Sequence, residues 1–203
     1  MNDNHITKDE GLQGNEKIEE AIAALQKELT DEMLAHTLTV IRRRMKAKGQ
    51  LILAVSGVKN SGKTTLIASL LSKLKQKGLK AAVIKHDGHE FEADIPGTDT
   101  WRFGEAGACG TLVFSGTKYM MVKYQPAPEP DELIACFPEA DVVLLEGFKY
   151  SEYPKIEVIR RGNSSRSVCD PRFLLGIVTD LRREELDAAG SALPEELPFF
   201  DLN

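Results

Sequence analysis

Cysteine is scarce in this chain of 203 residues. The three cysteines, Cys109, Cys136 and Cys169, lie far apart in the sequence. Their odd number and wide spacing match neither a disulfide framework nor the paired cysteines of a zinc site. We therefore expect reduced thiols, which are typical of a cytoplasmic protein.

Long apolar runs are missing as well. No stretch of the sequence approaches the roughly 20 consecutive apolar residues that a membrane-spanning helix needs. The first residues are polar and charged, which is unlike a secretory signal. We therefore expect a cytoplasmic protein with no membrane partner.

Positive charge is not in excess either. The chain has 26 Lys and Arg against 31 Asp and Glu, which gives a net charge of −5. Overall charge therefore does not favour non-specific binding to nucleic acid, and we expect no nucleic-acid partner. The length suffices for one α/β domain with a sizeable core and an appendage.

The chain does contain a complete phosphate-binding loop. Residues 57–64 have the sequence GVKNSGKT, which fits the pattern G-x-x-x-x-G-K-[ST]. The apolar residues 51–55 before it are typical of a buried parallel strand. After it, Leu66, Leu70 and Leu74 recur on one face of a predicted helix. Pattern and context together predict a site for a nucleoside triphosphate with Mg²⁺.

Each residue type in the loop suits that chemistry. Gly57 and Gly62 have no Cβ, so the backbone can bend tightly and approach phosphate oxygens. Lys63 supplies a cation for the β- and γ-phosphates, and Thr64 offers a hydroxyl to Mg²⁺. The loop amides and the helix N-terminus add partial positive charge. The expected nucleotide contacts are Gly57, Asn60, Ser61, Gly62, Lys63, Thr64 and, more weakly, Thr65.

Three segments are expected along the chain. Residues 1–14 are polar with few large apolar groups, so we expect disorder there. Residues 15–48 carry two amphipathic stripes, which predict a helical hairpin, with a single extended helix as the alternative. Residues 49–203 form the predicted nucleotide-binding domain.

Strand and helix patterns alternate within that domain. Strands are predicted at 51–55, 79–85, 142–145, 155–161, 174–178 and 197–202. Residues 111–114 and 118–123 are predicted to pair around a turn, and helices are predicted at 98–108, 131–137 and 183–189. The fold class that follows is α/β: a P-loop NTPase with a mainly parallel sheet, helices on both faces, a β-hairpin and an N-terminal helical extension.

A phosphate loop also needs a carboxylate near its Mg²⁺. Residues 142–146 have the sequence VVLLE, four apolar residues followed by an acid, with Glu in place of the usual Asp. Glu146 would lie at the carboxyl end of a strand, where ligands bind in α/β sheets. We assign it to a metal-bound water or to the attacking water. Asp87, also just past a strand, is the second metal candidate.

Two more strand ends carry candidates. No cysteine lies near His86 and His89, so they suit contact with substrate or phosphate better than structural metal, and a solvated loop fits equally well. Thr179 and Asp180 end another predicted strand. An Asp there could accept two hydrogen bonds from guanine, which adenine cannot offer, although many strands simply end in Asp.

Four segments form a more specific pattern. They are the loop with residues 62–66 (GKTTL), Lys85-His86 followed by His89, residues 94–99 (DIPGTD) leading to 106–108 (AGA), and residues 146–149 (EGFK) followed by 154–156 (PKI). In these the chain resembles the molybdopterin-guanine dinucleotide biosynthesis protein B family, over residues 51 to about 180. Residues 1–48 precede the usual start of that family.

The resemblance implies a cytoplasmic P-loop domain that binds GTP with Mg²⁺, hydrolyses it slowly and forms a homodimer. Such proteins assist the molybdopterin guanylyltransferase that attaches GMP to molybdopterin, and the resemblance extends to delivery of the cofactor to molybdoenzymes or their chaperones. By motif, Lys63 and Glu146 carry over as the groups that would act in hydrolysis. Asp99, Arg102 and Lys149 are site candidates without an assigned role.

Two other functions fit the same loop. One is a small-molecule kinase, with a lid formed by Arg160, Arg161, Arg166 and Arg172. The other is a nucleotide-gated scaffold whose N-terminal hairpin binds a partner. No obvious glutamine or arginine finger follows the loop, so we expect slow hydrolysis, with Arg102 as the one candidate finger in cis.

Overall fold

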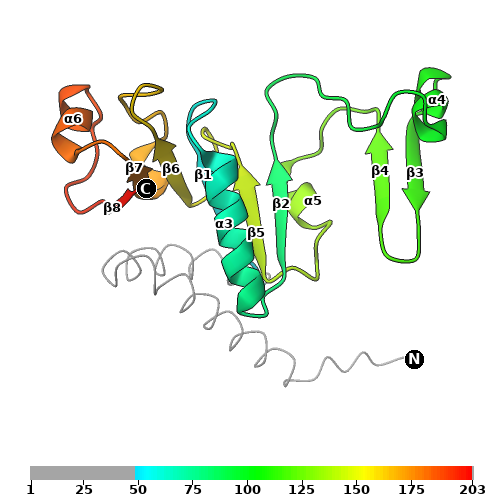
Figure 1. Ribbon diagram of the computed structural model, residues 1–203, viewed down its shortest axis with the longest axis horizontal. Coiled ribbons are helices and arrows are strands. Elements are labelled where there is room, and N and C mark those ends of the chain that lie inside the picture. The colour runs from blue at the N-terminus through cyan, green and yellow to red at the C-terminus, as the bar shows by residue number, and fades with distance from the viewer. Residues whose placement is uncertain (1–48, 203) are drawn as a thin grey trace, which may run out of the picture. The chain divides into compact units, whose positions relative to one another are not determined.

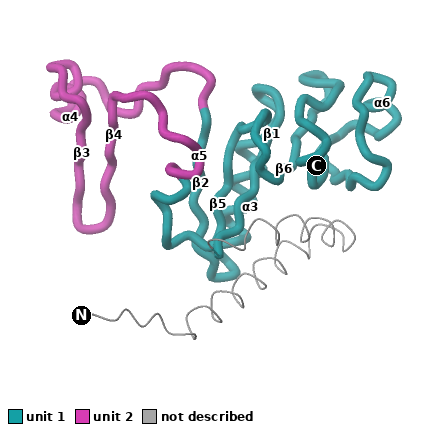
Figure 2. The backbone as a smooth tube through the Cα atoms, turned by 180° about the vertical axis from the view of Figure 1, so that it is seen from behind, with its two compact units in different colours: residues 1–86, 134–203 teal, residues 87–133 magenta. Residues whose placement is uncertain are grey.

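The computed structural model describes residues 49–202, shown in colour in Figure 1. The predicted disorder at 1–14 and the predicted helices at 15–48 lie outside the described residues. The described chain divides into two compact units (Figure 2). Unit 2 comprises residues 87–133, and unit 1 comprises the described residues on either side of it.

Unit 1 is built on a six-stranded sheet with the strand order β2-β5-β1-β6-β7-β8. Every neighbouring pair in it is parallel. The strands are β1 (Leu51–Ser56), β2 (Ala81–Lys85), β5 (Val142–Glu146), β6 (Lys155–Ile159), β7 (Leu174–Thr179) and β8 (Phe199–Asp201). The predicted parallel sheet is confirmed.

The central strands are apolar because both of their faces are covered. All five residues of β5 are buried, and the four apolar ones are fully buried. A strand with one face in water would alternate apolar and polar residues instead. The continuous run VVLLE therefore fixes β5 in the middle of the sheet, beside β1.

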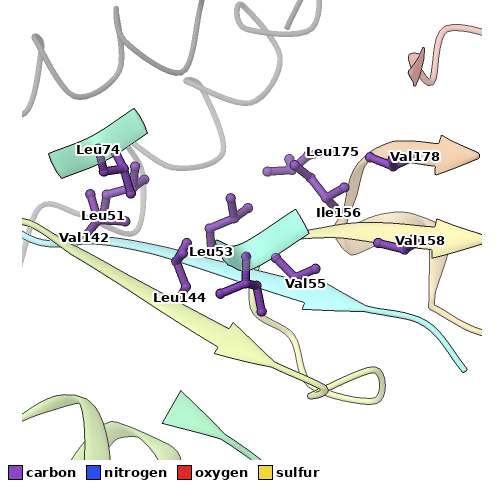
Figure 3. Packing of buried hydrophobic residues seen from close by; sticks show 11 residues of the cluster. Leu51, Leu53, Val55, Leu74, Val142, Leu144, Ile156, Val158, Leu175 and Val178 are labelled. Atoms are coloured by element: carbon purple, nitrogen blue, oxygen red, sulfur yellow. The ribbon is translucent and has the colours of Figure 1, made fainter. Parts of the chain in front are cut away.

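Helices cover both faces of the sheet, as predicted. On one face α3 (Lys63–Gln76) packs Ile67 and Leu74 against residues such as Leu53 and Leu144 (Figure 3). On the other face Leu186 of α6 (Arg183–Ala188) packs with Ile159 and Ile177. In β6, Ile156 and Val158 belong to the first cluster and Ile159 to the second, which is the alternation expected of a strand between two layers.

Unit 2 contains the predicted hairpin, one short helix and most of a second. Strands β3 (Gly110–Phe114) and β4 (Tyr119–Lys123) pair in antiparallel register, with Phe114 opposite Tyr119. Helix α4 (Asp99–Glu105) begins at Thr98, whose side chain accepts a hydrogen bond from the Trp101 backbone. The remaining short helices are α5 (Pro130–Ile134) and the 3₁₀ turn η1 (Pro171–Phe173).

No helix within residues 49–202 is long and apolar enough to cross a bilayer.

Several predicted elements are shorter in the structure. The helix predicted to reach residue 108 ends at Glu105, because Gly107 turns the chain with a φ of +94°. The strand predicted to reach residue 161 ends at Ile159, where the chain turns and Ser164 donates to the Arg160 carbonyl. In both cases a local turn ends the element two or three residues earlier than predicted.

The buried Cys169 gives a test of the core. Burial, with a contribution from the nearby Glu157, raises the pKa of the Cys169 thiol to about 12, while Cys109 and Cys136 are exposed. At pH 8 the Cys169 thiolate should be about one part in 10⁴, and only thiolate attacks disulfide reagents. We expect two thiols per native chain to react with a chromogenic disulfide reagent, and the third only in denaturant. In a Cys169→Ala variant the two-thiol count should persist, and three fast thiols in the native wild type would contradict this packing.

Candidate nucleotide site

The loop between β1 and α3 has a backbone that only certain residues tolerate. Gly57, Asn60 and Gly62 all have positive φ, at +136°, +61° and +105°. A side chain on Gly57 would collide with the Val158 carbonyl oxygen of the neighbouring strand β6. Glycine is therefore required at position 57 by both conformation and space. These angles curl the segment into the concave loop that the motif predicted.

The N-terminus of α3 is left without a counter-charge. Gly62 is its N-cap and makes no side-chain cap, and no acidic residue lies in the first turn. The first intrahelical bond closes from the Leu66 amide to the Gly62 carbonyl at 3.0 Å. The preceding amides and the helix dipole thus favour an anion at this point. Thr65 is exposed in that first turn.

Lys63 lies folded back over the loop. Its Nζ donates a hydrogen bond of 2.6 Å to the Val58 carbonyl oxygen. Burial lowers the pKa of Lys63, Glu146 acts in the opposite direction, and the charges of Lys149 and Lys85 lower it further. A phosphate could replace the single carbonyl as its partner, because the ammonium has three donors.

The predicted metal acid meets the predicted metal hydroxyl. Thr64 Oγ1 donates to Glu146 Oε1 at 3.0 Å, joining the start of α3 to the end of β5. Glu146 is 9% exposed. A hydroxyl, a carboxylate and phosphate oxygens are the oxygen ligands that Mg²⁺ takes, usually with several waters retained. Residues 49–202 hold no cluster of three or more His, Cys, Asp or Glu that could bind a metal, so this pair is the metal candidate that geometry supports.

His86 joins the same edge of the sheet. Its backbone amide donates to the Glu146 carbonyl at 3.0 Å, and its ring lies 5.7 Å from that of Phe148. Lys149 follows Phe148 directly and is half-buried. The structure thus brings Lys63, Thr64, Glu146, His86 and Lys149 together around the loop.

Ser61 and Asn60 complete the loop in different ways. Ser61 is fully buried, and its hydroxyl has no hydrogen-bond partner within the described part of the chain. Asn60 is exposed. The neighbouring Lys59 carbonyl accepts a 2.9 Å hydrogen bond from the side chain of Asn163, in the connection after β6. No pattern in the sequence indicates this contact, because Asn163 lies over a hundred residues away from Lys59 in a polar turn.

Two buried charges in β6 were also not foreseen. Lys155 and Glu157 are 0% and 1% exposed. The Lys155 ammonium donates to the Ser151 carbonyl, and Glu157 accepts from the Ser167 hydroxyl at 2.5 Å and the Val168 amide at 2.8 Å. The alternation in this segment predicted a strand but did not indicate that its two charged side chains are buried. Ser167 and Val168, in the segment after β6, fold back onto Glu157.

Thr179 and Asp180 end β7, two strands away from β1. The Thr179 hydroxyl accepts from the Leu181 amide at 3.0 Å. Asp180 Oδ1 accepts from the Arg161 amide at 2.6 Å, and the Arg161 guanidinium donates to Glu185 at 2.8 and 2.9 Å. A carboxylate has about four acceptor positions, so Asp180 retains acceptor capacity for a base.

The other predicted site residues belong to unit 2. They are Asp87, His89, Asp99 and Arg102. Within that unit Arg102 lies 4.0 Å from Asp99, as an exposed pair one helical turn apart. Such pairs contribute little stability. Their assignment to the site stays a sequence prediction.

Comparison with known proteins identifies one family that this chain is similar to. The family model of molybdopterin guanine dinucleotide synthesis protein B matches residues 52–180. A molybdopterin-guanine dinucleotide biosynthesis adapter protein of Escherichia coli is 30% identical over 139 residues, which cover 64% of this chain and 78% of that protein. Its namesake in Haemophilus influenzae is 34% identical over 132 residues, 64% and 74% of the two chains.

A solved structure shows the same fold. The crystal structure of Bacillus subtilis MobB superposes with a TM-score of 0.59 at 29% identity, covering 75% of this chain and 90% of that one. The matched region includes the loop, Thr64 and Glu146. The chain therefore belongs to the molybdopterin guanine dinucleotide synthesis protein B family.

Proposed function

We propose that this chain is a Mg·GTP-binding adapter in the biosynthesis of molybdopterin guanine dinucleotide. The observation that carries the proposal is the 3.0 Å hydrogen bond between Thr64 and Glu146, beside a helix N-terminus that has no acidic or capping side chain. Hydroxyl, carboxylate and bare amides lie together where a magnesium triphosphate needs them. The adapter role rests on the names of the related proteins.

Hydrolysis in this site is slow at most. Mg²⁺, when bound, neutralises charge on the terminal phosphates. Lys63 would hold the β- and γ-phosphates, and Glu146 would orient either a water held by the metal or the attacking water. In unit 1 the nearby Arg161 is already paired with Glu185, so it is not poised as an arginine finger. The nucleotide then acts chiefly as a ligand that the adapter holds.

GTP rather than ATP is the proposed nucleotide. Asp180 lies at the carboxyl end of β7, on the same edge of the parallel sheet as the loop. Guanine presents two donors to a carboxylate, and adenine does not reproduce that pair. The Arg161 amide holds Asp180 in a fixed position for this contact.

The proposed partner is the molybdopterin guanylyltransferase in the cytoplasm, with molybdoenzymes or their chaperones as later partners. A kinase is less well supported. Of the four arginines that would form its lid, Arg161 pairs with Glu185 and Arg172 with Asp170 at 2.5 Å. Both guanidinium groups would have to leave their partners to reach a phosphate.

A homodimer is the proposed assembly, and the hairpin supports it. Leu112 lies opposite Met121, and Phe114 opposite Tyr119, so all four side chains share one face of the hairpin. They are 54%, 51%, 78% and 71% exposed. A face this apolar in water is typical of a protein interface.

Removing the loop ammonium tests nucleotide binding. We expect Lys63→Ala to weaken binding of a fluorescent GTP analogue with Mg²⁺ by about 100-fold, because charge-assisted contacts to phosphate are lost. Lys77→Ala, at the far end of α3, is the matched control and should bind as wild type does. Circular dichroism and the melting temperature should be unchanged in both. Wild-type affinity in Lys63→Ala would place the nucleotide elsewhere.

Glu146→Gln separates hydrolysis from binding. The amide keeps the size of the side chain but removes its charge and proton-accepting capacity. We expect Mg²⁺-dependent release of phosphate from GTP to fall about tenfold or more, with GTP affinity changed less than threefold. The measurement is a single-turnover assay at saturating protein. An unaltered rate would clear Glu146 of any role in the chemistry.

Charge on the hairpin face tests the dimer. We expect Phe114→Glu with Tyr119→Glu to convert the protein to a monomer in sedimentation velocity, because a buried unpaired carboxylate is costly. Thr117→Glu adds one carboxylate at the hairpin turn, away from this face, and should leave the dimer intact. A dimer that survives the double substitution does not use this face.

A further inference from the structure

The turn after Glu146 is held by several backbone hydrogen bonds. The Gly147 amide donates to the Val55 carbonyl at 3.0 Å, and the Gly147 carbonyl accepts from the Ser56 hydroxyl at 2.5 Å. The Phe148 carbonyl accepts from both the amide and the hydroxyl of Ser151, at 3.0 and 2.8 Å. The segment of residues 147–151, which we call the Lys149 turn, is therefore fixed to β1 and closed on itself.

The buried Lys155 binds the last residue of the same turn. Its ammonium donates to the Ser151 carbonyl, and it lies 5.4 Å from the centre of the Phe173 ring. A fully buried lysine is costly unless its charge finds acceptors. The carbonyl of Ser151, the last residue of the Lys149 turn, is one such acceptor, so this bond also holds the end of the turn.

The turn also contains backbone strain. Phe148 has a φ of +46°, in the left-handed region that bulky residues avoid, directly after Gly147 at +101°. Its ring packs between His86 at 5.7 Å and Tyr153 at 6.4 Å, which holds it there. Strained residues of this kind persist where the surroundings fix them, and they cluster at ligand sites.

Lys149 lies within this fixed turn. It occupies the second position of the Phe148–Ser151 turn, three residues after Glu146. Its ammonium lies 4.8 Å from the centre of the exposed Tyr150 ring, and it forms no hydrogen bond or ion pair with any residue between 49 and 202. It is close enough to Lys63 for the two charges to repel each other.

Positive charge is thus concentrated at one edge of a chain whose net charge is −5. Lys85 joins Lys63 and Lys149 there, on β2 directly beside Glu146. Like charges brought together in the folded protein are unfavourable until a polyanion lies between them. Lys63 is assigned to the β- and γ-phosphates, and Lys149 follows Glu146, the candidate metal acid, by three residues in the sequence.

We propose that Lys149 binds the terminal phosphate of the triphosphate, so that the Lys149 turn makes the site distinguish GTP from GDP. This inference rests on the proposed function, since it presupposes a nucleotide on the loop. To the proposed function it adds a residue, Lys149, whose contact depends on the γ-phosphate being present. An adapter with such a residue holds the triphosphate more tightly than the diphosphate.

The test compares two ligands across three variants of the full chain. Binding of a non-hydrolysable GTP analogue and of GDP, each with Mg²⁺, is measured by calorimetry for Lys149→Met, Lys149→Arg and the control Lys77→Met. We expect Lys149→Met to weaken the triphosphate analogue about tenfold and GDP less than twofold, because one charge-assisted contact is lost. Lys149→Arg should retain the preference for the triphosphate analogue over GDP, and Lys77→Met should bind both ligands as the wild type does.

The outcomes separate this inference from the proposed function. Wild-type binding of both nucleotides by Lys149→Met would overturn the role of Lys149 and leave the loop site intact. An equal loss of both ligands would also overturn it, since Lys149 would then act on the loop itself. Absence of nucleotide binding in the wild type would overturn both proposals together.

Discussion

Parallel pairing around β1 is the constraint on which the rest depends. Because β2, β5 and β1 run in the same direction, their carboxyl ends meet at one edge of the sheet. The register places Val55 beside Glu146 and Lys85 beside Glu146. The loop that follows β1 then carries Thr64 to within 3.0 Å of the acid. One register therefore fixes both halves of the metal candidate.

The packed core stabilises that strand register, and the loops of the site extend from it. Fully buried Val142, Leu144 and their neighbours fill the layer under α3, so the sheet cannot slip without exposing them. Against this rigid frame the protein maintains costly features: the positive φ of Phe148, the buried Lys155 and the mutual repulsion of Lys63 and Lys149. Phe148 and Lys149 follow the carboxyl end of β5, and Lys155 bonds to the same turn through Ser151. A polyanionic ligand would relieve the repulsion between the two lysines.

The sequence was sufficient for features that depend on local pattern. The motif at 57–64 located the loop, and the apolar run before Glu146 located the acid, because both patterns follow from a strand that must be buried. It was insufficient where long-range contacts decide. Asn163 donates to the Lys59 carbonyl, the Arg161 amide donates to Asp180, and Ser167 donates to the buried Glu157. No periodic pattern along the chain predicts these long-range contacts. The assignment of four residues to the site still rests on the sequence pattern alone: Asp87, His89, Asp99 and Arg102.

The central claim is that the loop after β1 holds a magnesium triphosphate between Lys63, Thr64 and Glu146. The most direct measurement is a crystal structure of the protein with a non-hydrolysable GTP analogue and Mg²⁺. We expect the Lys63 ammonium to leave the Val58 carbonyl for the phosphates, and the Thr64 hydroxyl to turn from Glu146 to the metal. An analogue bound elsewhere, with the Lys63–Val58 and Thr64–Glu146 hydrogen bonds intact, would contradict the account.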